Sequence, residues 1–525
     1  MKHINKIISS ICALLILCTA CDDDFFDKKP TGAISEEAYW TTENDVKSWM
    51  SGTYSGVQDV MSASYTLWGD GRSDNFYPTI YDNADSWQLN ALTSNISQTD
   101  WTALYDVIDR CNIALAKLDA MTIADLNKSY YKGQFYSIRA LMYFYAIRLW
   151  GDVPLVVEAW NGDRSALYLP RTDVREIKVQ IESDLKNAVN ELALNVDAIL
   201  PPNSSCFYFN KASAMALKMS VHMWFKEFQE ALEASDFIIE TKKYNLVTNP
   251  TDWKNIFLKP ESSSETMLTL TWTDTNDKNL YGSKLCSSDK NPSFSVSREV
   301  FSLLLRDKRD VRLWGVLDTL AIFNAANKIS INPFSVTPGA QRGDKLTKFC
   351  SFEYTISTTK DTTITFTIPG QNYCYYKLPL IRYADVLLMR AEILNKMDRP
   401  QEALDIVNAI RSRCGNGIKA DLSTYNVKSG TSVASRERCI LDERQAEFYG
   451  EGIRWFDLLR ADNNQDGSTP NFDFYMDNHL KDLQNYFGTE LVGFGNPQRK
   501  LLPIYYKVFV YNPLLRGHQN LPYSE

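Results

Sequence analysis

The residues best suited to chemistry in this chain are aromatic side chains that lie among polar groups in two stretches, 65–100 and 268–341. A sugar ring has an apolar C–H face and a rim of hydroxyls, so a glycan site needs a flat exposed aromatic and polar partners for the rim. Polar neighbours leave Trp68, Tyr81 and Trp87 least to pack against, and we expect this trio at a ligand. The predicted ligand-binding set is Trp68, Arg72, Tyr77, Tyr81, Trp87, Trp272, Tyr281 and Trp314. For Trp314 the alternative is a place in a helix core.

Catalytic motifs are missing from the sequence. Three histidines follow the first twenty residues, and there is no H-E-x-x-H, no phosphate loop and no dinucleotide fingerprint. The cysteines after Cys21 form no C-x-x-C pair. We therefore predict a binding protein without a cofactor and not an enzyme. A surface glycoside hydrolase remains the alternative, because its carboxylate pair cannot be recognised by spacing in the sequence.

One stretch fits a metal-binding template in part. Asp462, Asn464, Asp466, Gly467 and Asp473 occupy positions 1, 3, 5, 6 and 12 of a calcium loop. Aspartate at the last position is shorter than the usual bidentate glutamate, and a proline lies inside the loop. We interpret the stretch as a solvated turn and predict no metal site.

The first residues predict secretion and lipid anchoring. Two lysines precede the apolar run 7–17, and the small residues Thr19 and Ala20 then precede Cys21. The run is shorter than the roughly 20 residues that span a bilayer, as is every later apolar stretch. We expect a signal peptide over 1–20 and lipidation at Cys21, with Cys18 as the rival acceptor. Three aspartates after Cys21 resemble the tag that sends lipoproteins to the outer surface.

Composition limits the partners and the fold. A net charge of −8 and a pI near 5.3 argue against nucleic acid and against an anionic lipid surface as the partner. Apolar residues make up 44% of the chain, which is enough for a substantial core. The cysteines after Cys21 are widely spaced and odd in number, so they indicate no disulfide framework.

Helical periodicity dominates the remaining chain. Apolar residues recur at spacings of three or four over 383–397, and Pro400 then begins a second run that ends near Gly415. A second helical hairpin is predicted over 211–244, and further amphipathic runs cover 101–118, 131–150 and 174–194. The alternation over 352–368 predicts a small β-hairpin around a turn at 359–361. We expect a mainly α fold in one body, 21–525, with tetratricopeptide-like hairpins and loop inserts near 65–100 and 268–341.

Five ordered motifs resemble the SusD/RagB family of outer-membrane nutrient-binding lipoproteins. They are CDDDFFDKKPTGAISEEAYW, IRALMYFYAIRLWGDVPLV, LPLIRYADVLLMRAEILNK, ERQAEFYGEGIRWFDLLR and LLPIYYKVFVYNPLL. The resemblance implies a cell-surface protein, anchored in the outer membrane, that binds a glycan and delivers it to a TonB-dependent SusC-like transporter. Some members of the family bind peptides instead, which leaves that ligand class open.

Charged residues within these motifs have a structural explanation. They lie among apolar residues on predicted helices, where an unpaired charge would be costly. We expect them to form ion pairs that hold hairpins together. The residues are Arg382, Asp385, Arg390, Glu443, Arg444, Arg454 and Asp457.

Overall fold

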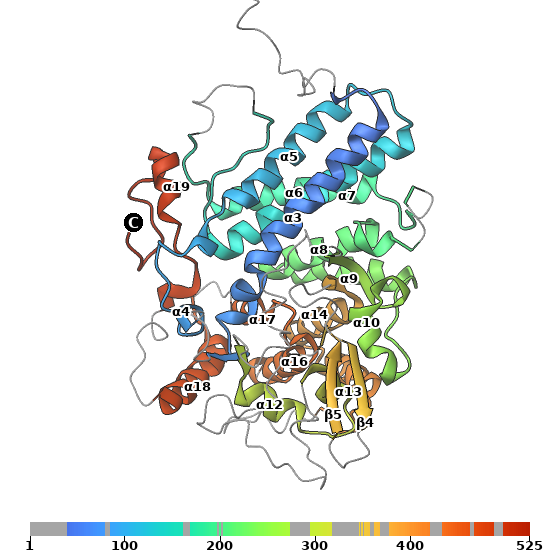
Figure 1. Cartoon of the computed structure of the whole chain (residues 1–525), viewed down its shortest axis with the longest axis vertical. Helices are drawn as coiled ribbons and strands as arrows, with labels where there is room; N and C mark the ends of the chain where they lie inside the picture. The colour runs from blue at the N-terminus through green and yellow to red at the C-terminus, as the bar shows by residue number, and fades with distance from the viewer. Residues whose placement is uncertain are drawn as a thin grey trace, which may run out of the picture.

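A stack of paired α-helices forms most of the molecule (Figure 1). The computed structural model describes residues 39–78, 85–160, 168–196, 199–200, 203–272, 294–317, 346, 348–349, 351–356, 362–367, 377–420, 433–462, 467–487 and 497–525. In the upper half of Figure 1 lie α3 (Glu43–Thr66), α5 (Thr102–Leu118), α6 (Asp125–Trp150) and α7 (Val174–Glu191). Each of α5, α6 and α7 packs against the next helix in the chain.

Two helical hairpins continue the stack, as the periodicity predicts. The first consists of α8 (Lys211–Trp224) and α9 (Phe228–Glu240), and Lys226 makes the turn with a φ of 63°. The second consists of α14 (Tyr383–Lys396) and α15 (Pro400–Arg413). Because α14 packs on both α8 and α9, the two hairpins form one layer although about 140 residues separate them in the chain. The mainly helical architecture is therefore confirmed.

Short strands make a minor contribution. β4 (Ser351–Ile356) and β5 (Thr362–Thr367) pair antiparallel with Ser351 opposite Thr367, which confirms the predicted hairpin. β2 (Thr266–Thr271) pairs with β6 (Lys377–Arg382), and this pair leads directly into α14. β1 (Phe76–Pro78) pairs with β3 (Phe294–Val296) and so brings together the two stretches that the sequence marks as loop inserts.

The described parts of these two stretches are more regular than a loop. In the first stretch, α3 runs into a π-helical turn, Leu67–Gly71, and α4 (Asp85–Gln88) is a single turn. Outside both stretches, α10 (Asn255–Leu258) is another single turn and packs near β6. α12 (Arg298–Leu304) and α13 (Val311–Val316) follow β3. The C-terminal part consists of α16 (Val433–Phe448), α17 (Arg454–Ala461), α18 (Pro470–Phe487) and α19 (Tyr506–Tyr511). No helix in the described ranges is long and apolar enough to cross a membrane.

A buried network of ion pairs joins α13, α15, α16 and β6. Glu447 accepts hydrogen bonds from Arg382 at 2.6 Å, from Arg413 at 2.7 Å and from Arg312 at 3.2 Å. Burial by itself would raise the pKa of Glu447, but these guanidinium groups lower it well below its usual range. The seven motif charges all have ionic partners, which confirms the predicted pairing.

Replacing Glu447 with glutamine should strongly destabilise the fold. The substitution keeps the shape of the side chain but leaves three buried guanidinium groups short of one negative charge, which costs about 3–5 kcal/mol when a buried pair is broken. The free energy of unfolding, measured by denaturant titration with circular dichroism, should fall by that amount. Glu402→Gln is the matched control, because Glu402 pairs with Arg399 at the surface and its loss should leave stability unchanged.

The difference in stability between wild type and Glu447→Gln should depend on pH. A carboxyl with a lowered folded pKa stabilises the protein above its unfolded pKa of about 4.3, and that contribution is lost as the pH falls. The difference should therefore be full at pH 7 and shrink below about pH 4. A difference that stayed constant down to pH 3 would contradict an ionised Glu447.

Candidate functional site

A large cavity opens between the first turns of α5, the segment 154–160, residues 168–169 and the end of α19. It has a volume of about 810 Å³. Figure 1 shows α19 on the same side of the molecule as the beginning of α5. Ligand pockets for small molecules typically have volumes of about 300–1,000 Å³. The cavity is therefore large enough to enclose a few sugar rings.

One face of α5 forms the first wall. Thr102, Tyr105, Asp106 and Asp109 line the cavity, and their spacing of three and four residues places them in one stripe along the helix. Trp101 precedes the helix and is buried, with its ring edge-on to Trp150 at a centroid distance of 5.7 Å. The wall therefore has an apolar base and carboxylates along its length.

A sharp turn after α6 starts the second wall. α6 ends at Trp150, and Gly151 adopts a φ of 74°, a left-handed conformation in which a β-carbon would be strained. The carboxylate of Asp152 accepts a hydrogen bond at 3.0 Å from the backbone N–H of Val174, the first residue of α7. The Gly-Asp-x-Pro turn thus directs the chain from α6 across the cavity and fixes the start of α7.

Buried polar side chains hold this second wall in place. Tyr143 donates a hydrogen bond to the carbonyl of Val156, and the N–H of Val156 approaches the same hydroxyl at 2.7 Å. Asn112 donates to the carbonyls of Val156 and Glu158 at 3.1 and 3.2 Å. Arg139 donates to the side-chain oxygen of Asn112 at 2.7 Å. An ion pair between Arg139 and Asp184 at 2.6 Å orients the guanidinium and links α6 to α7.

Exposed aromatic rings surround the cavity mouth. Trp160 is 52% exposed, Tyr168 is 44% exposed, and Tyr511 of α19 is 64% exposed. The side chain of Asn512 donates to the carbonyl of Leu169 at 2.8 Å, which fixes the end of α19 beside Tyr168. These rings keep apolar faces accessible to solvent, as a sugar-binding surface requires.

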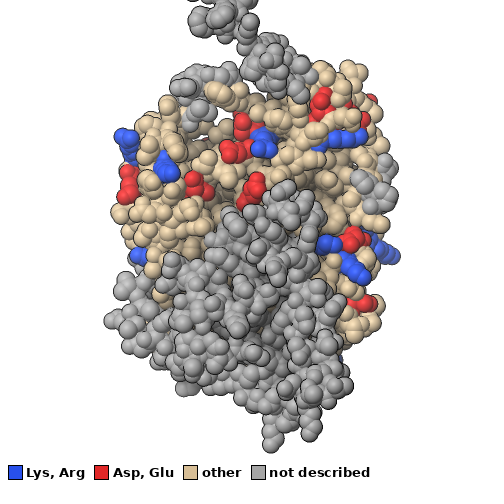
Figure 2. Space-filling model, in the orientation of Figure 1, with Lys and Arg blue, Asp and Glu red and all other residues tan. Residues whose placement is uncertain are grey.

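Carboxylates give the cavity a negative potential. Asp106, Asp109 and Glu158 line it, and no described lining residue is cationic. Burial raises the pKa of Asp109, with the negative charge of Asp106 adding to the effect. Burial likewise raises the pKa of Asp106, although Arg110 opposes it. On the face of the molecule drawn in Figure 2, acidic and basic side chains of the described residues are interspersed.

The aromatic residues predicted as ligand contacts lie elsewhere, and most of them are buried. Trp68 and Trp272 are 2% exposed, Trp87 is 3% exposed and Tyr77 is 4% exposed. The expectation that polar neighbours would leave Trp68 and Trp87 accessible is therefore wrong. Trp68 instead donates to the carbonyl of Gln98 and packs edge-on against Trp150 at 5.8 Å.

The polar residues near Trp68 also serve the interior. Arg72 is fully buried, with its guanidinium 4.2 Å from the ring centroid of Trp455 and a hydrogen bond to the carbonyl of Arg499. Asp70 accepts hydrogen bonds from the backbone N–H groups of Gly452 and Arg454 at 2.9 and 3.2 Å. These contacts hold the 65–78 stretch against the start of α17. Its polar side chains are therefore not available to bond the hydroxyls of a sugar.

Three predicted contacts have a different outcome. Trp314 is 41% exposed on α13, and its indole N–H donates to the carbonyl of Lys308 at 2.8 Å. Tyr81 and Tyr281 lie outside the described residues. The exposure of Trp314 fits a ligand contact, and all three stay predictions.

Trp160 and Tyr168 were missed in the sequence prediction. The segment AWNGDR places Trp160 among the same residue types that favoured the other stretches, so the signal was present. The segment follows directly on the Gly-Asp-x-Pro motif, whose role is structural. Aromatic residues are also less dense in it than in the stretches 65–100 and 268–341. Exposure depends on which residues the tertiary fold packs against each ring, and that information is not local.

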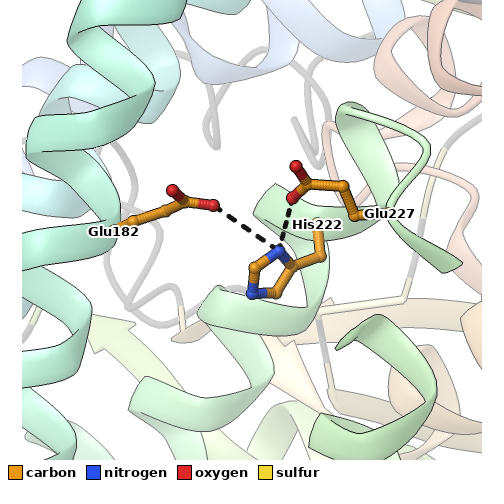
Figure 3. Close-up of side chains that lie close together, drawn as sticks. All are labelled: Glu182, His222 and Glu227. Carbon is orange, nitrogen blue, oxygen red and sulfur yellow. Dashed lines mark hydrogen bonds and ion pairs between the residues drawn. The ribbon is translucent and has the colours of Figure 1, made fainter. Parts of the chain in front are cut away.

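A cluster of Glu182, His222 and Glu227 has the residue types of a metal site (Figure 3). The Nδ1 atom of His222 lies 2.7 Å from Glu227 and 3.7 Å from Glu182. Lys178 already forms ion pairs with both carboxylates, at 3.3 Å to Glu182 and more closely to Glu227. The lysine ammonium thus supplies the positive charge that a cation would bring, and the cluster links α7 to the turn between α8 and α9.

The first and last aspartates of the calcium-loop template bond to residues at or near the start of α18. Asp462 accepts hydrogen bonds from the side chain of Asn471 at 3.1 Å and from the backbone N–H of Phe472, in the first turn of α18. Asp473 accepts a hydrogen bond from the hydroxyl of Thr469 at 2.8 Å. Both carboxylates at the ends of the template therefore have partners within the fold, while Asn464 and Asp466 lie outside the described residues.

Two family models match the chain. The model described as "SusD family" matches residues 343–523, and the model described as "Starch-binding associating with outer membrane" matches residues 24–220. SusD-like protein P38 of Formosa agariphila is 27% identical over 491 residues, which cover 88% of this chain and 92% of that protein.

Solved structures show the same fold. A structure named laminarin binding SusD-like protein superposes with a TM-score of 0.67 at 21% identity, covering 92% of this chain and 100% of that one. A putative sugar binding protein from Bacteroides vulgatus gives a TM-score of 0.66 at 21% identity, covering 92% and 99%.

Substituting Tyr143 with phenylalanine should loosen the cavity wall. The change removes a hydroxyl that bonds the backbone of Val156, and an unsatisfied buried group costs about 1–3 kcal/mol. We expect faster amide hydrogen exchange in a peptide covering 154–160, measured by mass spectrometry, while α6 itself keeps its protection. Tyr145→Phe is the control, because Tyr145 lies on the same helix but packs against Phe456. Equal exchange in the two variants would show that Tyr143 does not hold the wall.

Proposed function

This chain belongs to the SusD family, and from that membership we propose that it binds a glycan outside the cell and delivers it to a SusC-like TonB-dependent transporter. SusD proteins bind and do not catalyse, so the chain is not an enzyme. The family description places these proteins at the outer membrane. Transport would therefore follow from capture and transfer of an intact oligomer.

The cavity beside α5 is the observation that carries the proposal. Its mouth has Trp160 and Tyr168 with rings open to solvent, and its walls have carboxylates and the amide of Asn512 near them. A ring stacked on the apolar face of a sugar and an acceptor for its hydroxyls together provide affinity and orientation. The printed names of two structural neighbours, laminarin binding and sugar binding, support the same ligand class.

The rigid wall behind the rings supports the same role. The segment that carries Trp160 is bonded to two helices, to α5 through Asn112 and to α6 through Tyr143 and Arg139. A ring held in place by its backbone loses less conformational entropy when a ligand binds, so more of the contact energy appears as affinity. This arrangement favours a preformed sugar platform.

Membrane attachment in the proposal rests on Cys21. A lipidated cysteine would hold the binding body at the outer membrane, where the transporter lies. Cys21 is outside the described residues, and the evidence for it is the sequence pattern alone.

Replacing Trp160 and Tyr168 together with alanine should weaken glycan binding at least tenfold. Burying one aromatic face contributes about 1.5–3 kcal/mol, and about 1.4 kcal/mol corresponds to a factor of ten in affinity. The measurement is a glycan array screen followed by isothermal titration with each glycan that wild type binds. Released reducing ends in the same mixtures would contradict a purely binding role.

Two further variants make this result specific. Leu126→Ala removes an exposed apolar side chain near the start of α6, roughly 36 Å along the helix from Trp150, and should leave binding unchanged. Trp314→Ala tests the exposed aromatic on α13. If Trp314→Ala abolishes binding and the double variant does not, the ligand site lies at the 268–341 stretch and the cavity proposal fails.

Substituting Cys21 with serine should release the protein from membranes. Serine cannot carry the thioether-linked lipid, so the full-length chain expressed in its own cell type should leave the membrane fraction. Cys18→Ser is the matched control and should stay membrane-bound. If the Cys18 variant is the one released, lipidation occurs at Cys18.

A further inference from the structure

Charge is unevenly distributed in the cavity beside α5. Asp106 and Asp109 lie one helical turn apart on α5, and Glu158 faces the cavity from the opposite wall. No lysine, arginine or histidine is among the described lining residues. An incoming group would therefore meet negative charge on two sides.

Among the described residues, two arginines near the cavity are committed to other partners. Arg110 donates to the carbonyl of Gly52 at 2.8 Å and points toward α3. Arg171, which is close enough to influence Tyr105, donates to the carbonyls of Asp152, Trp150 and His518. Neither guanidinium lines the cavity or offers a free fork to an anion.

The two aspartates already respond to this environment. Burial raises the pKa of Asp109, a hydrogen bond from the backbone of Trp160 opposes this, and the charge of Asp106 raises the pKa further, so an additional negative charge nearby would be unfavourable. Like charges brought together at a binding surface repel each other. A neutral hydroxyl, in contrast, can donate a hydrogen bond to each carboxylate.

From this arrangement we infer that the cavity selects its ligand by charge: it accepts neutral oligosaccharides and rejects glycans that carry sulfate or carboxylate groups on the bound rings. The inference rests on the proposed function, because it assigns a ligand class to the same site. It also gives Asp106 and Asp109 a role in ligand specificity, in addition to their structural place in the cavity wall.

A matched pair of ligands tests the selection. Each neutral glycan that wild type binds is oxidised at its primary alcohols, which converts CH2OH groups into carboxylates and leaves the ring faces unchanged. Wild type should bind the oxidised form at least tenfold more weakly in 20 mM salt, measured by isothermal titration. The difference should shrink in 500 mM salt, because the Debye length falls from roughly 20 Å to a few Å.

The double variant Asp106→Asn, Asp109→Asn should bind the oxidised form several-fold more tightly than wild type does. Asparagine keeps the size of the side chain and an acceptor oxygen but removes the charge. Asp405→Asn with Asp477→Asn changes the net charge equally at two exposed positions that do not line the cavity, and should leave the discrimination as in wild type.

Three results separate the two proposals. Equal affinity of wild type for neutral and oxidised forms would overturn charge selection while leaving glycan binding intact. Charge selection would also be overturned if the double variant of Asp106 and Asp109 showed the same ratio of neutral to oxidised affinity as wild type. Neutral binding that survives loss of Trp160 and Tyr168 would instead overturn the assignment of the site itself.

Discussion

The packing of the interior depends on the carboxylate of Glu447, because three guanidinium groups from separate elements bond to it. Arg382 enters from the end of β6, Arg413 from the end of α15 and Arg312 from α13. In a low-dielectric interior each of these charges requires its partner, so the elements cannot shift independently. Neighbouring pairs extend the same constraint, with Arg444 bonded to Asp457 and Arg454 bonded to Asp74. The result fixes the mutual orientation of segments that lie far apart in the chain.

A rigid interior allows the surface to carry the proposed ligand site. The wall that displays Trp160 has no regular secondary structure of its own, and it is held by side chains of α5 and α6. Those helices are in turn fixed by the ion pair between Arg139 and Asp184 and by apolar packing along the stack. Binding by a preformed site of this kind avoids much of the entropy that ordering a loose segment would cost.

The same principle separates structural from functional polar groups. Asp70, Arg72 and Asp74 are fully buried, and their side chains interact with other groups inside the fold. Asp106 and Asp109 line an open cavity, where their charge can act on a ligand. The cluster of Glu182, His222 and Glu227 belongs with the structural groups, because Lys178 supplies its countercharge.

The sequence determined the features that depend on neighbours along the chain. Apolar spacing located both helical hairpins, and the alternation over 352–368 located the β-hairpin. Only the tertiary structure decided which aromatic rings face solvent. Trp68 is covered by Trp150, and Arg72 is stacked on Trp455, a residue almost four hundred positions away. Burial is set by such long-range contacts, whereas periodicity is local, so the stack could be predicted while the ring-lined cavity beside α5 could not.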